Sequence, residues 1–171
     1  MKAPKVAILM GSDSDLPVAQ KAVETLSEFE IPCEVRVMSA HRSPEKVWEF
    51  AVNARADGFA VIIAIAGGAA HLAGVVSSAT TLPVIGVPVA TSVAGGLDSL
   101  LSTSQMPGGV PVLTVGSNSG GPTNAAVAAA RILALADEHL AARLDAYRAA
   151  LAQSVDVKDA KIVAHFAKPR D

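Results

Sequence analysis

The sequence has few of the residues that mark several large classes of protein. Its one cysteine, Cys33, cannot form an internal disulfide and offers no cysteine cluster to a metal. Aromatic residues make up 4%, and 14 Lys and Arg against 16 Asp and Glu leave a formal net charge of −2. Nucleic-acid binding needs a basic face and aromatic stacking surfaces. We therefore expect a cytoplasmic protein that binds neither nucleic acid nor a metal.

Long apolar runs are also missing. The longest weakly polar stretch, residues 59–70, contains two glycines and is shorter than the roughly 20 residues that a bilayer requires. The apolar run at residues 6–10 is too short for the core of a secretory leader. Yet hydrophobic residues make up 51% and the mean hydropathy is +0.41, mostly from Ala and Val. We expect no membrane contact, and we expect the extra apolar surface to lie in contacts of a homo-oligomer.

Short β-branched runs alternate with segments of helical period. The runs that predict strands are 5–10, 33–38, 61–66, 83–87 and 110–115. The helices are expected to start near Pro17, at Pro44 after a Ser43 cap, and near His71, with a short one before the fifth strand. A long helical segment over about 124–154, broken near Asp137, precedes a weakly patterned tail at 155–171.

This alternation predicts a flavodoxin-like three-layer α/β/α sandwich with a central parallel sheet. No linker separates domains, so we expect a single catalytic domain over 1–171. Residues 5–136 would form its core, and residues 137–171 would form a C-terminal helix and tail in subunit contacts. Ligands of such sheets bind outside the carboxyl ends of the strands.

The first three predicted strands end in small and polar residues, at 11–15, 39–43 and 66–71. The first of these loops opens a helix, whose free N–H groups favour an anion. Ser12 and Ser14 can donate hydroxyls to a phosphate, and Asp15 can accept hydrogen bonds from ribose hydroxyls. An alternative that stays open is that Asp15 or Ser14 only caps the helix.

Two histidines and an arginine occur in the second and third loops. His41 is the natural proton shuttle, because an imidazole titrates near neutral pH, although a lone histidine is often only a surface residue. Arg42 has the fork geometry that suits a phosphate. His71 can orient a ligand or cap the third helix, and the sequence does not decide between these roles. The glycines at 67–68 lack the full dinucleotide fingerprint, so they do not indicate a dinucleotide site.

At these same loops the sequence resembles the bacterial class I N5-carboxyaminoimidazole ribonucleotide mutases, the phosphoribosylaminoimidazole carboxylase catalytic-subunit family. The likeness covers roughly residues 5–148. Its motifs are MGSDSD (10–15), SAHRSPEK (39–46), AGGAAHLAG (66–74), PVIGVPV (83–89), GLDSLLS (96–102), QMPGGVPV (105–112) and NAAVAAARILA (124–134). Ordered motifs of this kind are far more specific than any one of them alone.

The resemblance implies a homo-octamer of purine biosynthesis that needs neither metal nor organic cofactor. It implies transfer of a carboxylate from the exocyclic amine of the imidazole to the adjacent ring carbon, with His41 as general acid and base. The residues implied in substrate binding are Ser12, Ser14, Asp15, Ser39, Ala40, Arg42, Gly67, Gly68, Ala70, His71 and Leu72. Among them, the loop at 66–71 would help to enclose the released carbon dioxide.

The sequence departs from the family pattern at Ala73, where proline is usual, at Ala90-Thr91, where Gln-Ser is usual, and over 115–123. A direct carboxylase or a paralogue acting on another nucleotide is therefore an alternative, and a non-enzymatic nucleotide or flavin-binding module is a second. Direct carboxylases usually carry lysine after the histidine of the second loop and a polar Arg-Ser-Asn run in the third. Arg42 and the sequence at 67–71 follow the mutase pattern instead.

Overall fold

A computed structural model describes residues 4–167 of the chain; residues 1–3 and 168–171, at the ends of the expected domain, lie outside it. All strands are parallel and form one sheet of order β2-β1-β3-β4-β5. The strands are β1 (Lys5–Met10), β2 (Cys33–Val37), β3 (Phe59–Gly67), β4 (Val84–Val89) and β5 (Leu113–Thr114). The helices are η1 (Asp13–Asp15, a 3-10 turn), α1 (Leu16–Glu28), α2 (Pro44–Asn53), α3 (Leu72–Ala79), α4 (Leu97–Ser104), α5 (Gly121–Ala134) and α6 (Glu138–Phe166).

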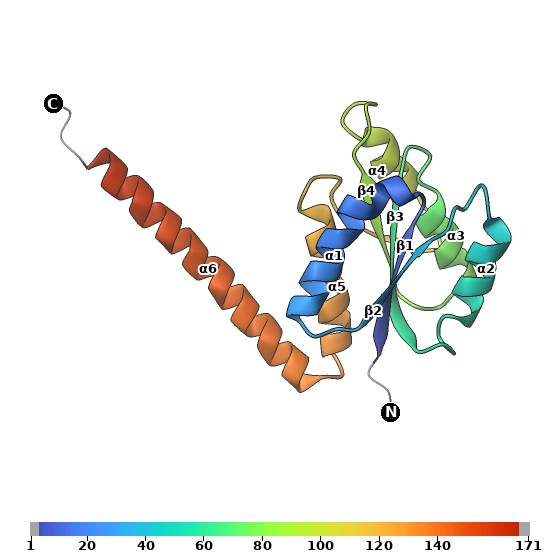
Figure 1. Ribbon diagram of the computed structural model, residues 1–171, viewed down its shortest axis with the longest axis horizontal. Coiled ribbons are helices and arrows are strands. Elements are labelled where there is room, and N and C mark those ends of the chain that lie inside the picture. The colour runs from blue at the N-terminus through green and yellow to red at the C-terminus, as the bar shows by residue number, and fades with distance from the viewer. Residues whose placement is uncertain (1–3, 168–171) are drawn as a thin grey trace.

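Helices cover both faces of the sheet, which confirms the predicted flavodoxin-like sandwich (Figure 1). Side chains alternate along β1, as they must in an extended strand. Val6 and Ile8 pack under α1 and α5, whereas Ala7 and Leu9 pack under α2 and α3. The alternating apolar residues of this buried strand therefore serve two separate cores.

The fifth strand is shorter than the sequence predicts. Residues 110–115 were expected to extend, but only Leu113 and Thr114 pair with β4. Pro111 has no N–H to give to a ladder, so pairing begins after it. Beyond the strand, the N–H of Val115 still donates to the carbonyl of Gly86 at 3.0 Å.

The break predicted near Asp137 is confirmed, because this residue caps α6 through a 3.0 Å bond from the N–H of Leu140. The helix then continues to Phe166, well past the predicted end near residue 154. Its first turns pack on the chain's own core, where Tyr147 meets Phe29 edge to face at 5.2 Å. The start of this helix is therefore held by its own chain, and the assignment of residues 137–171 to subunit contacts stays a prediction.

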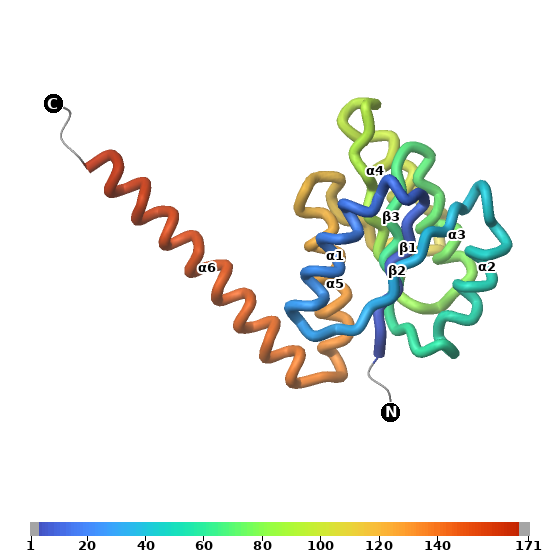
Figure 2. The backbone as a smooth tube through the Cα atoms, viewed as in Figure 1, coloured from blue at the N-terminus to red at the C-terminus, as the bar shows by residue number. Residues whose placement is uncertain are grey.

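Beyond Tyr147, α6 leaves the body of the molecule as a free rod (Figures 1 and 2). Every residue from Arg148 to Phe166 is exposed except Ser154, which is half-buried. No helix within residues 4–167 is long and apolar enough to cross a membrane.

Helix α4 docks closely on β4 at Gly86. A Cβ at that position would collide with the side chains of Thr103 and Val112, so only glycine lets α4 lie at this distance. Thr103 is buried there, and its hydroxyl donates to the carbonyl of Ser99 at 2.8 Å. The close approach brings the N-terminal half of α4 beside the loops that follow β3 and β4.

Candidate active site

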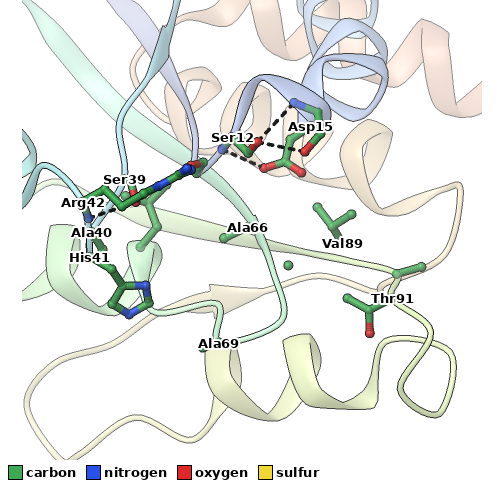
Figure 3. A pocket seen from close by; sticks show the side chains of 15 residues that line it. Ser12, Asp15, Ser39, Ala40, His41, Arg42, Ala66, Ala69, Val89 and Thr91 are labelled. Atoms are coloured by element: carbon green, nitrogen blue, oxygen red, sulfur yellow. Dashed lines mark hydrogen bonds between the residues drawn. The ribbon is translucent and has the colours of Figure 1, made fainter.

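The loops after β1, β2, β3 and β4 surround a cavity of about 500 Å³ at the carboxyl edge of the sheet (Figure 3). His41 and Arg42 lie on one side of it, and Val89 and Thr91 lie on the other. The lining residues are Gly11, Ser12, Ser14, Asp15, Ser39, Ala40, His41, Arg42, Ala66, Gly67, Ala69, Leu72, Val89, Ala90 and Thr91. The cavity thus lies where parallel α/β sheets usually bind their ligands.

Most of the residues singled out in the sequence line this cavity, but three of them do not. Ala70 is fully buried, so it cannot touch a ligand. Gly68 turns its N–H to the hydroxyl of Ser99, and its φ of +67° is the left-handed value that favours glycine. His71 lies outside the lining and contacts His41 instead.

One lining segment, residues 89–91, is not among the site residues that the sequence predicts. Val89 was not named, and Ala90 and Thr91 were named only as departures from a family pattern. All three follow or end β4, so the rule that pointed to the first three strand ends applies to them equally.

In the first loop, Ser12 and Asp15 bond each other reciprocally. The N–H of Ser12 donates to the Asp15 carboxylate at 3.2 Å, and the N–H of Ser14 donates to the Ser12 hydroxyl at 3.3 Å. This capping box closes the 3-10 turn before α1. Asp15 occupies the N-cap position of α1, but its side chain makes no hydrogen bond to that helix and bonds only within the 3-10 turn, while it also lines the cavity.

Asp15 is only 7% exposed. Burial raises the pKa of its carboxyl above the ordinary value, and the charge of Asp13 adds to the rise. The hydrogen bond from the Ser12 N–H acts the other way and lowers the pKa. A buried carboxylate with one donor has acceptor capacity left, which suits the hydroxyls of a sugar.

Ser43 stabilises the second loop by bonding Ser39, and not by capping α2 with its side chain as the sequence predicts. Its hydroxyl forms no bond to α2 but donates to the carbonyl of Ser39 at 3.2 Å and accepts the Ser39 N–H at 3.1 Å. Arg42 extends from this loop to the first one, where its guanidinium lies 3.4 Å from the carbonyl of Gly11. The cation is thereby placed near the hydroxyls of both loops (Figure 3).

The third loop supplies a partner for the candidate proton shuttle. His41 Nε2 and His71 Nδ1 lie 2.8 Å apart, with the rings edge to face. Such a bond needs a proton on one of these nitrogens and a lone pair on the other. His71 occupies the N-cap position of α3, but its side chain caps nothing there. The structure supports neither of the two roles left open directly, because His71 makes no cap hydrogen bond and lies outside the cavity lining; its ring contacts His41.

The cavity combines three chemical features. Arg42 and the serine hydroxyls can hold an anion, Asp15 can accept from hydroxyl groups, and the His41 ring can give and take a proton. The remaining wall is small and apolar, at Ala66, Leu72 and Val89. Within residues 4–167, no three His, Cys, Asp or Glu side chains come close enough together to hold a metal ion.

The fold and the cavity define a flavodoxin-like protein whose cavity at the carboxyl edge of the sheet is lined by an arginine, a histidine, a carboxylate and serine hydroxyls. Residues 5–154 match the model of the AIR carboxylase family, and the chain belongs to that family. An N5-carboxyaminoimidazole ribonucleotide mutase of Mycobacterium leprae is 55% identical over 161 residues, which is 94% of this chain and 93% of the relative. A mutase of the same name from Thermotoga maritima is 53% identical, covering 89% of this chain and 88% of the relative.

A solved structure agrees with the fold. Treponema denticola PurE superposes with a TM-score of 0.84 at 34% identity, over 92% of this chain and 98% of that one.

Replacement of Asp15 by asparagine tests the cost of its burial. The raised pKa means that the folded state favours the protonated carboxyl, so the chain loses stability as the pH rises through that pKa. The asparagine amide would keep an oxygen for the Ser12 N–H without a charge. We expect Asp15→Asn to unfold at higher urea concentration than the wild type at about pH 7, with a gain that shrinks toward about pH 4.

Asp57→Asn, made on an exposed residue, controls for the loss of a surface carboxylate. An Asp15→Asn protein that is less stable than the wild type by the same amount at every pH would contradict the effect of burial.

Proposed function

We propose that this protein converts N5-carboxyaminoimidazole ribonucleotide to 4-carboxy-5-aminoimidazole ribonucleotide in de novo purine biosynthesis. The observation that carries the proposal is the position of His41. It lines the cavity beside Arg42, and its Nε2 lies 2.8 Å from Nδ1 of His71, which is outside the lining. Relatives that share more than half of their residues with this chain, over nearly its full length, bear the mutase name. Residues 5–136 would form the core of a single catalytic domain that spans the chain.

The substrate would be held by its phosphate and its ribose. Arg42 and the hydroxyls of Ser12, Ser14 and Ser39 would bind the phosphate, because these donors lie around one end of the cavity. Asp15 would accept hydrogen bonds from the ribose hydroxyls. Ala40, Gly67 and Leu72 would then border the imidazole ring without offering it a competing charge.

The chemistry needs two proton transfers through one imidazole ring. As the N–C bond of the carbamate breaks, carbon dioxide leaves and the amine nitrogen takes a proton from the imidazolium of His41. The ring carbon next to the amine then attacks carbon dioxide and forms the new C–C bond. His41 takes the proton that this carbon loses, which restores both the aromatic ring and the imidazolium. No oxidant, reductant or second substrate is required.

The apolar wall supports the mutase over a direct carboxylase. Ala66, Gly67 and Leu72 offer no charge that would collect dilute carbon dioxide from solution. A phosphate-anchored substrate that carries its own carboxylate avoids that problem through proximity.

The test compares product formation from the carboxylated nucleotide with that from the uncarboxylated nucleotide plus bicarbonate and dissolved carbon dioxide. We expect the carboxylated substrate to react faster at equal nucleotide concentration. Faster turnover of the uncarboxylated nucleotide would identify a direct carboxylase instead, and no turnover of either would overturn the proposal.

His41→Asn is expected to bind the product nucleotide while losing turnover. The loss should be about 10²–10⁴-fold or more, since general acid–base catalysis contributes that much and one ring serves both transfers. Steady-state kinetics and equilibrium binding measure the two effects separately. His139→Asn, on the exposed start of α6, is the matched control. Substantial turnover in His41→Asn would remove the proton shuttle from the mechanism.

We further propose that the protein works in the cytoplasm as a homo-oligomer, an octamer by resemblance to the family. The support for assembly is an apolar stripe along α6, with residues spaced by three, four or seven positions. The stripe consists of Leu140, Leu144, Tyr147, Leu151, Val155, Ile162 and Phe166. Its first three members cover the chain's own core, whereas the last four are exposed, Phe166 to 73%. A second copy of the chain would cover them.

Charges placed on the exposed part of the stripe should break the assembly. We expect the double variant Leu151→Asp and Val155→Asp to sediment as a smaller species that keeps its fold by circular dichroism. The control places the same charges on the opposite side of the same turns, as Ala149→Asp and Gln153→Asp. Sedimentation of the stripe variant at the wild-type size would contradict the interface.

A further inference from the structure

Helix α4 contributes no lining residue to the cavity, yet its hydroxyl side chains reach the loop that follows β3. The Ser99 hydroxyl is fully buried and accepts the N–H of Gly68 at 2.9 Å. The Ser102 hydroxyl lies 3.3 Å from the carbonyl of Gly68 and bonds the carbonyl of Asp98 more closely, at 2.6 Å. Both backbone groups of one glycine are therefore held from the same helix.

Two tight turns connect this glycine to the histidine pair. The N–H of Ala70 donates to the Gly68 carbonyl, and the N–H of His71 donates to the Ala69 carbonyl, each at 2.8 Å. Three residues of chain with two such bonds have little freedom, so the position of Gly68 determines where the His71 ring lies. His71 in turn bonds His41 at 2.8 Å.

The same helix also holds the opposite wall of the cavity. The Thr91 hydroxyl donates to the Asp98 carboxylate at 2.7 Å. Just before the helix, Gly96 has a φ of +98°, and a Cβ there would lie 2.8 Å from the Cα of Ala90. Helix α4 therefore contacts the loop with the histidine and the segment at 89–91 at once.

We propose that Ser99 is a positioning residue for the proton shuttle: by holding Gly68 it places His71, and through His71 it fixes the tautomer and the orientation of the His41 ring. The kinetic part of this inference rests on the proposed function, whereas the geometric part does not. Ser99 touches neither the cavity nor the imidazole rings. Its hydroxyl accepts from the Gly68 N–H at 2.9 Å and lies 3.5 Å from the Asp98 carboxylate, so the closer of its two contacts leads to the backbone at 68–71.

The test uses the full chain with four single substitutions. Ser99→Ala removes the acceptor for the Gly68 N–H, and Ser99→Thr keeps it. Ser104→Ala is the matched control, because Ser104 is exposed on the same helix and its hydroxyl has no hydrogen bond within the described residues. Ser102→Ala, which removes the weaker contact with the same glycine, is the second probe if Ser99→Ala does not fold.

The first readout needs no substrate. Ring ¹⁵N spectra of the histidines distinguish a protonated from a bare nitrogen. In the wild type and in Ser104→Ala, we expect one fixed tautomer at the His41–His71 bond. In Ser99→Ala we expect averaged ring signals at both histidines, and in Ser99→Thr we expect the wild-type signals to return.

The second readout is the kinetics of the mutase reaction. Ser99→Ala should lower kcat by about 10- to 100-fold, the range that a misplaced catalytic group costs, while KM for the ribonucleotide changes far less. A merely structural role would lower the amount of active enzyme without changing the ring spectra of the folded protein. Ring spectra and kcat in Ser99→Ala that match those of Ser104→Ala would overturn the inference. If the histidine ring spectra change in Ser99→Ala as expected but the wild type shows no mutase turnover, the proposed function is overturned and the positioning role of Ser99 stands.

Discussion

The parallel direction of all strands is the constraint on which the site depends. Because every strand ends at the same edge, loops that lie far apart in the sequence meet there without any long-range signal between them. The sheet order places β1 and β3 side by side at its centre, while the chain leaves β1 toward β2 on one side and leaves β3 toward β4 on the other. The diverging loops leave the space that the cavity occupies.

The first loop satisfies most of its own polar groups before any ligand arrives. Ser12, Ser14 and Asp15 bond one another, so the turn is rigid and its geometry does not depend on a substrate. Arg42 is different, since its contacts with Gly11 and Ser39 are long, at 3.4 Å. A bound anion can therefore accept hydrogen bonds from the guanidinium while only these weak contacts are lost. The site thus combines a rigid first loop with one arginine whose side chain can adjust to a ligand.

The sequence predicts the layers and the strand-end loops of this protein better than the hydrogen bonds between those loops. The alternation of strand-like and helix-like segments is sufficient to predict the sandwich. The positions of the strand ends are sufficient to predict that the loops with His41 and Arg42 meet the loop with Ser12 and Asp15. The strand ends also bring His71 to this edge, but its bond to His41 has no signal in the sequence, because it depends on the side-chain positions and on the tight turns after Gly68. Ala70 is fully buried beside the tight turns after Gly68 and does not line the cavity, which the sequence pattern does not indicate.

Helix α6 shows how one amphipathic pattern can serve two purposes. At about 1.5 Å per residue its 29 residues span roughly 44 Å, far more than the part that touches the sandwich. Isolated helices shorter than about 12–15 residues are marginal in water, and the free part of α6 exposes apolar side chains, most of them along one stripe. Packing must therefore supply the stability that helix propensity does not. Because the stripe continues without a change of face from Leu140 to Phe166, the same pattern that binds the helix to its own core would bind it to a neighbouring copy.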